Sequence, residues 1–147
     1  MPTPLPFFKQ ETPYSCVPAC LRMALAHWNI ETNEDQLRLR SYTTWWGTRA
    51  RDAVACIQSF GLAAEEIRDA TLNDLRQWLK QDGVAILLID LQPLRGEIGR
   101  HSIIVESLSE TQVHYIDPLS GRHTSTLDII DRAWRLNYRR AILIRST

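Results

Sequence analysis

The sequence predicts an α+β fold in which N-terminal helices pack on a small antiparallel sheet. Up to Gly83, apolar residues recur at steps of three and four, which is the period of an amphipathic helix. After Gly83, short runs of β-branched or alternating residues are separated by turn signals, which is typical of strands. Because the predicted helices come first and the strands second, we expect helices packed against one sheet.

Composition and length favour a single domain that spans residues 1–147. The chain has 147 residues, of which 44% are hydrophobic, enough for one core. Seventeen basic and seventeen acidic residues give a net charge of zero, so no global attraction to nucleic acid or an anionic membrane is expected. The longest apolar run, residues 84–91, is too short to cross a bilayer, and the N-terminal residues lack the features of a signal peptide. These observations predict a cytoplasmic protein.

The first half of the chain begins with an extended, proline-rich strap over residues 1–15. The pattern then predicts a helix over residues 17–28, with Pro18 in its first turn, where a missing N–H is tolerated. A second helix is expected from an N-cap at Thr32 or Asn33 up to Arg40.

Two more helices are predicted before the strands begin. One lies within residues 47–62, with Thr48 as its N-cap and Gly61 as its stop. The other lies within residues 71–83, where Thr71 and Asp74 have the spacing of a capping box and Gly83 ends the helix.

Four strands are predicted in the second half of the chain. They cover residues 84–91, 101–108, 112–118 and 140–145, and a short helix over residues 126–134 precedes the last of them. Turn signals near residues 94–99, 109–110 and 120–121 separate these elements, so we expect a mostly antiparallel sheet.

The three cysteines, Cys16, Cys20 and Cys56, are expected to be free thiols. Their number is odd, and disulfides are rare in a reducing compartment. The paired Cys-x-x-Cys clusters of structural zinc sites are missing, so neither a metal nor another cofactor is expected. Cys20 lies one helical turn after Cys16 and Cys56 lies on an apolar helix face, so both are interpreted as core residues.

Cys16 is different because it lies where the first helix begins. The free N–H groups and the positive end of the dipole at a helix N-terminus favour a thiolate, which is the nucleophilic form of cysteine. Gln10 precedes it on the strap by six residues, so its side-chain amide could return beside the helix start. There the amide and the Cys16 backbone N–H could hold an oxyanion.

His101 and Asp117 complete the candidate site. His101 opens a predicted strand directly after the turn "RGEIGR", and Asp117 closes the following strand. If these strands are antiparallel neighbours, the first residue of one lies near the last residue of the other. Cysteine, imidazole and carboxylate would then form the nucleophile, base and orienting group of acyl transfer.

The order of these residues resembles the papain-like cysteine peptidases of the C39 group, which process bacteriocin precursors at double-glycine leaders. The resemblance rests on Gln10-x5-Cys16-x2-Ala19 at the start of a helix, followed by "HSIIVE" and "YIDPLSG", and it covers most of the chain. It implies a papain-like fold, with Cys16 as nucleophile, Gln10 in the oxyanion hole, His101 as general base and acid, and Asp117 as the residue that orients the histidine.

The chain departs from the pattern of that group next to the cysteine. The usual segment is Asp-Cys-Gly, whereas this chain has Ser15-Cys16-Val17 followed by Pro18. A branched side chain at Val17 narrows the approach to the nucleophile, so Val17 is a candidate substrate-binding residue. Peptidases of the group are often the first domain of an export transporter, whereas this sequence resembles the stand-alone members or a domain of a longer protein.

Trp45 and Trp46 are the other candidate substrate-binding residues. Two adjacent indoles next to Gly47 are not easily buried together, so one could line a substrate groove, or the pair could anchor a loop on the core.

The leading hypothesis is a cysteine peptidase that cleaves a peptide or protein substrate, such as a leader or other extended peptide, through a Cys16 thioester. A catalytically silent papain-like domain that binds a peptide or partner protein is one alternative. An acyltransferase that uses the same thioester is another, because hydrolysis and transfer share the acyl-enzyme.

Overall fold

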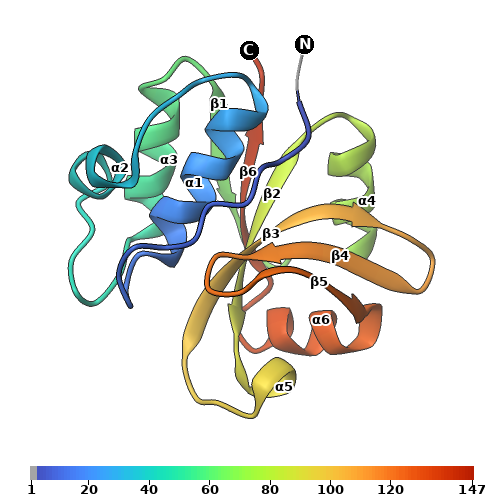
Figure 1. The fold of residues 1–147 in the computed structure, drawn as a ribbon. Helices are drawn as coiled ribbons and strands as arrows, with labels where there is room; N and C mark the ends of the chain where they lie inside the picture. Colours follow the sequence, from blue (N-terminus) through green and yellow to red (C-terminus); the bar gives the residue numbers. More distant parts are fainter. Residues whose placement is uncertain (1–2) are drawn as a thin grey trace.

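A six-stranded antiparallel sheet forms the centre of the computed structural model, which describes residues 3–147 (Figure 1). The strand order is β1-β6-β2-β3-β4-β5, and every neighbouring pair is antiparallel. The strands are β1 (Ala63–Ile67), β2 (Val84–Asp90), β3 (Arg100–Leu108), β4 (Gln112–Asp117), β5 (Gly121–Thr126) and β6 (Arg140–Arg145).

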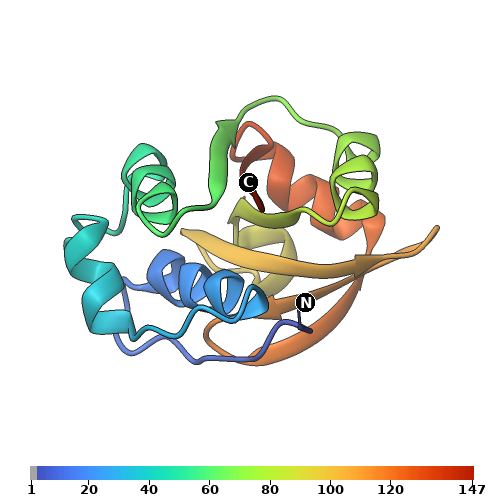
Figure 2. The ribbon, with the colours of Figure 1, turned by 90° about the horizontal axis from the view of Figure 1, so that it is seen from above.

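Helices cover both faces of this sheet (Figure 2). Side chains of β2 alternate between two cores: Ile86 and Leu88 pack in one, and Ala85, Leu87 and Ile89 pack in the other. The first core is closed by α1 (Cys16–His27), α2 (Glu34–Arg40) and α3 (Ala50–Gln58), and the second by α4 (Leu72–Lys80) and α6 (Leu127–Arg135). A single short helix, α5 (Gln92–Arg95), precedes β3.

The α+β class and the antiparallel sheet are confirmed, but β1, β5 and α5 were not predicted. β1 and β5 are the two edge strands of the sheet, and most of their side chains are not buried. A strand exposed at an edge does not need the apolar alternation by which strands are recognised in a sequence. For this reason only the four inner strands have an apolar pattern that can be recognised in the sequence.

The helix caps show one error and one success of local prediction. The prediction that Thr48 caps α3 is wrong: Arg49 occupies the N-cap position without a side-chain cap, and the Thr48 hydroxyl lies 2.6 Å from that of Thr43. The capping box of α4 is confirmed, because the Thr71 hydroxyl accepts the Asp74 N–H and the Asp74 carboxylate accepts the Thr71 N–H.

A β-bulge at Glu106 shifts the register between β3 and β4. Leu108 pairs with Val113 and Ser107 with His114 near the hairpin, but after the bulge Ile104 pairs with Ile116. Without the shift, Ile116 would lie opposite Val105. The bulge therefore moves every later residue of β4 to the opposite face relative to β3.

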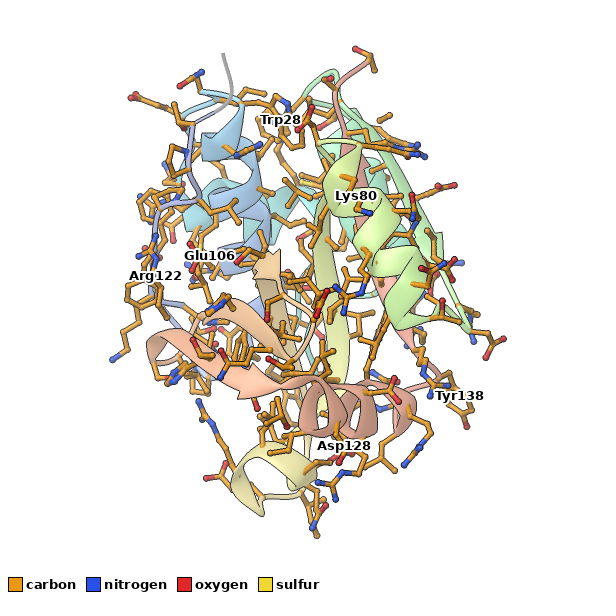
Figure 3. The ribbon with its side chains drawn as sticks, turned by 90° about the vertical axis from the view of Figure 1, so that its right-hand side faces the viewer. Trp28, Lys80, Glu106, Arg122, Asp128 and Tyr138 are labelled. Atoms are coloured by element: carbon orange, nitrogen blue, oxygen red, sulfur yellow. The ribbon has the colours of Figure 1, made fainter. Side chains whose placement is uncertain are left out.

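The N-terminal strap lies against α1 and against the β3–β5 region of the sheet. The Thr3 N–H donates to the His27 carbonyl at the end of α1. Arg122 of β5 donates to the Leu5 carbonyl at 2.6 Å, and it also donates to the Glu106 carboxylate at 3.2 Å (Figure 3). These contacts hold the strap in an extended course that leads to the start of α1.

Within residues 3–147, no helix combines the length and the apolar character needed to cross a membrane.

Candidate active site

The start of α1 leaves backbone donors free beside Cys16. Ser15 is the N-cap residue, yet its hydroxyl makes no cap hydrogen bond and instead interacts with the backbone N–H and carbonyl of Thr12. Because Pro18 has no N–H, the first-turn donors are those of Cys16 and Val17. The half-buried Cys16 thiol thus lies at the positive end of a 12-residue helix.

Cys16 and His101 form a hydrogen-bonded pair between α1 and the start of β3. Burial raises the pKa of the Cys16 thiol, but the hydrogen bond and charge of His101, with hydrogen bonds from Ser102, lower it below its ordinary value. Burial lowers the pKa of His101, whereas its hydrogen bonds to Asp117 and Cys16 and the charges of both residues raise it to about 9. Both shifts favour a thiolate beside an imidazolium over the neutral pair.

Asp117 holds the imidazole from the other side. Its Oδ1 lies 2.7 Å from His101 Nε2, which leaves Nδ1 of the ring for Cys16. Burial raises the pKa of Asp117, but the hydrogen bond and charge of His101, the Leu119 N–H and the charge of Arg95 lower it below its usual range. Asp117 is therefore a carboxylate that fixes both the charge and the orientation of the histidine.

The bulge at Glu106 is what brings Asp117 to His101. With Ile116 opposite Ile104, Asp117 follows on the same face of the sheet as His101, because residues opposite each other and residues two apart share a face. In the unshifted register Asp117 would lie on the other face.

Arg95 is a site residue that sequence reasoning missed. Its guanidinium donates to Asp117 Oδ2 at 2.6 Å and to the Ser120 hydroxyl at 3.0 Å. Arg95 is the last residue of α5, in a segment predicted only as a turn. No sequence signal links it to a carboxylate 22 residues later, so only the fold reveals this contact.

Gln10 is buried, and the strap places it beside the turn that follows Asp117. Its backbone N–H donates to the carbonyl of Pro118 at 2.8 Å. Its side-chain amide donates to the Thr12 carbonyl at 2.7 Å, which leaves the second N–H of that amide uncommitted, while its Oε1 has no partner within residues 3–147. The structure thus places the His101 ring between Cys16 and Asp117 and ties Gln10 to the turn that precedes Cys16.

A cleft of about 450 Å³ opens onto Cys16 and His101. Val17 and Trp46 line it, whereas Trp45 does not and stacks on Trp46 with ring centroids 4.1 Å apart. Both indoles are exposed, at 69% for Trp45 and 81% for Trp46, so the alternative that they anchor the loop on the core is wrong. Thr44 and Gly47 pair across this turn and hold the two indoles at its tip.

The other two cysteines pack in the core, as predicted. Cys20 and Cys56 are buried, and burial raises the pKa of each thiol. Among residues 3–147 no group of three histidine, cysteine, aspartate or glutamate side chains is arranged to hold a metal ion. The chemistry that this site offers is nucleophilic attack by sulfur on a carbonyl, with an oriented acid and base beside it.

Solved structures that share this fold include two transporter peptidases. One is a double-glycine-motif protease of an AMS/PCAT transporter, solved with the leader peptide: it is 18% identical, with a TM-score of 0.79, and the match covers 99% of this chain and 94% of that one. The other is the peptidase domain of Streptococcus ComA, a bi-functional ABC transporter involved in quorum sensing: it is 20% identical, with a TM-score of 0.80, over 95% of this chain and 97% of that one. At these identities the likeness establishes the fold.

The sequence also matches a family model. No curated protein matches the chain. The model of the peptidase C39 family, however, matches residues 5–144, a span that includes Gln10, Cys16, His101 and Asp117. The chain therefore belongs to the peptidase C39 family and is a cysteine peptidase.

Proposed function

We propose that Cys16 is the nucleophile of this peptidase, that His101 is its general acid and base, and that Asp117 orients the histidine. The single observation that carries the proposal is the continuous chain of contacts from the half-buried thiol through the imidazole to a buried carboxylate. The raised pKa of His101 and the lowered pKa of Cys16 both favour the reactive ion pair.

In the first half of the reaction the Cys16 sulfur attacks the carbonyl carbon of the scissile peptide bond. A carbon–sulfur bond forms, and the carbonyl electron pair moves onto oxygen. The His101 imidazolium then gives its proton to the amide nitrogen as the carbon–nitrogen bond breaks. The C-terminal fragment leaves as an amine, and the N-terminal fragment remains as a Cys16 thioester.

In the second half, water attacks the thioester. The neutral His101 imidazole accepts a proton from the water as the new carbon–oxygen bond forms, and the carbon–sulfur bond then breaks. The N-terminal fragment leaves as a carboxylic acid, and the thiolate–imidazolium pair is restored. Asp117 stabilises the imidazolium at both ends of this cycle.

The oxyanion of each tetrahedral intermediate needs donors close to the Cys16 sulfur. We assign this role to the Cys16 backbone N–H and to the uncommitted N–H of the Gln10 side-chain amide. The proposal is supported by the free first turn of α1 and by the two hydrogen bonds that hold Gln10. One such donor contributes about 10²–10³-fold to the rate.

The proposed substrate is a leader or other extended peptide that lies along the cleft. The complex of the similar transporter protease with its leader peptide supports this substrate class. Val17 and Trp46 would contact the peptide beside the cleaved bond, and Trp45 would support Trp46 through their stacking. We further propose that residues 1–147 act as one domain in the cytoplasm, without a metal or cofactor.

A covalent probe tests the nucleophile directly. A peptide chloromethyl ketone that ends in Gly-Gly should alkylate the parent protein once, with loss of chloride, and intact-protein mass spectrometry should detect the adduct. Cys56→Ala, which removes a different buried thiol, should form the same adduct, whereas Cys16→Ala should form none. An adduct that persists in Cys16→Ala would refute the assignment.

A further inference from the structure

The cleft beside Cys16 is strongly basic, although the whole chain is neutral. Five arginines and one glutamate line it, an excess of four positive charges, whereas the full sequence has seventeen residues of each sign. The lining arginines are Arg49, Arg51, Arg68, Arg100 and Arg140. Positive charge is thus concentrated where a substrate would lie.

Two of these arginines interact with the acidic residue of the cleft. Glu66 accepts two hydrogen bonds from Arg140, at 3.0 and 2.8 Å, and Arg68 lies 3.8 Å from the same carboxylate oxygen. The negative charge of Glu66 is therefore already neutralised by these neighbours.

The other three, Arg49, Arg51 and Arg100, have exposed side chains with no hydrogen-bond or ion-pair partner anywhere in residues 3–147. An arginine guanidinium presents a planar fork of donors that matches a carboxylate. These three side chains leave that capacity unused around the cleft.

The three arginines lie in the same cleft as the reacting groups Cys16 and His101. Arg100 directly precedes His101 on β3, and Arg49 and Arg51 flank Ala50, the first residue of α3, which also lines the cleft. Arg49 is the N-cap residue of α3 and makes no side-chain cap, and Asp52 in the first turn of this helix is not among the residues that line the cleft.

We propose that this cleft selects peptides that carry a carboxylate next to the scissile bond, and that Arg49, Arg51 and Arg100 are the residues that recognise it. The inference deepens the proposed function and rests on it, because the cleft is centred on the Cys16–His101 pair. A peptide carboxylate fits this place better than a free phosphate, because the reacting groups are built for attack on a carbonyl. Lysine-rich or arginine-rich peptides would be repelled.

The test measures binding rather than turnover, so that it does not depend on catalysis. Cys16→Ala protein is titrated with two fluorescein-labelled, amidated Ala/Gly peptides that share a central Gly-Gly pair and differ only in glutamate or glutamine beside it. Fluorescence anisotropy at low salt should show the glutamate peptide bound about tenfold more tightly. The difference should shrink as salt is added, because the arginines are exposed.

Two further comparisons show which arginines cause the binding preference and which carboxylate of the peptide they recognise. In the Cys16→Ala background, Arg49→Gln/Arg51→Gln and Arg100→Gln should each reduce the preference, whereas Arg135→Gln, an exposed arginine of α6 outside the cleft, should retain it. The glutamine peptide with a free C-terminus, compared with its amidated form, shows whether a terminal carboxylate can replace the side chain.

The outcomes separate this inference from the proposed function. A preference for a carboxylate that the arginine variants lose supports the inference. The peptide that binds more tightly then shows whether the recognised carboxylate is a glutamate side chain or a free C-terminus. Equal binding of all the peptides, or a preference that Arg135→Gln also loses, overturns it even if the parent enzyme cleaves peptides through Cys16. Conversely, a preference without any Cys16-dependent cleavage would overturn the proposed function and leave the recognition intact.

Discussion

Cys16 and Cys20 lie one turn apart on α1, yet the helix presents them to opposite environments. Cys16 is half-buried at the cleft, where His101 lowers the pKa of its thiol. Cys20 is fully buried, its sulfur lies 3.6 Å from the Ser102 hydroxyl, and burial raises the pKa of its thiol well above the ordinary value.

This contrast shows how one helix gives its two thiols different surroundings. Both cysteines belong to the same helix, and Ser102 interacts with both thiols. Only Cys16 has an imidazole partner and an opening to the cleft, and only Cys16 occupies the first turn, where the helix dipole is felt. A charged partner therefore outweighs the desolvation that the two residues share.

The largest expected effect comes from removing each thiol in turn. Cys16→Ala should lower kcat/KM for peptide cleavage by at least about 10⁴-fold, because the proposed nucleophile is lost. Cys20→Ala should retain activity and instead lower the free energy of unfolding by about 1 kcal/mol, since it removes a buried sulfur. Steady-state cleavage assays and urea unfolding measure the two effects. Comparable activity losses in both variants would contradict this distinction.

Alkylation rates compare the two thiols without mutation. At neutral pH iodoacetamide should label Cys16 at least about a hundredfold faster than Cys20, because only the thiolate reacts, and the raised pKa and complete burial of Cys20 keep its sulfur protonated and out of reach. Peptide mapping after timed quenching gives the rate at each site over a range of pH. Equal labelling of the two cysteines in the folded protein would argue against a specifically activated Cys16.

The carboxylate behind the histidine is tested by Asp117→Asn. The proposed mechanism requires the thiolate and the imidazolium together, so activity of the parent should fall as pH rises through about 9, where His101 loses its proton. Asp117 raises the pKa of His101, so the variant should show this fall at lower pH and a kcat reduced by about 10²-fold. A pH profile of kcat/KM with an unchanged alkaline limb would exclude this role.

Arg95 acts on the histidine only through Asp117, so its effect should be smaller. Arg95→Gln removes a charge that lowers the pKa of Asp117 and a hydrogen bond of 2.6 Å to its Oδ2. We expect kcat to fall by about tenfold with little change in KM, because the carboxylate that orients His101 loses one of its hydrogen bonds. Arg132→Gln, which removes an exposed ion pair with Asp128 far along the chain, is the control. A change in KM alone would indicate a substrate contact instead.

The smallest effect should come from Ser102→Ala. Ser102 forms hydrogen bonds with the thiols of both Cys16 and Cys20. Hydrogen bonds from Ser102 lower the pKa of Cys16, so their partial loss should raise it and move the acidic limb of the pH profile to higher pH. The backbone contact from residue 102 remains, so kcat at the optimum should fall by less than about threefold. A large loss of activity at the optimum would give Ser102 a catalytic role.

Local patterns in the sequence were sufficient to predict several parts of this protein. The helical period from residue 17, with Pro18 in the first turn, placed Cys16 at a helix start. The apolar runs of the inner strands β2, β3, β4 and β6 placed His101 at a strand start and Asp117 at a strand end. These features depend on residues within a few positions of one another, so they can be predicted from the sequence alone.

Only the tertiary structure decided which of these residues meet and what surrounds them. The bulge at Glu106 sets the face on which Asp117 lies, and no local pattern distinguishes the two registers. Arg95 and the arginines of the cleft come from segments far apart in the chain, and the edge strands β1 and β5 carry no apolar alternation. Contacts of this kind arise from long-range packing, whereas propensity and periodicity describe only the neighbours along the chain.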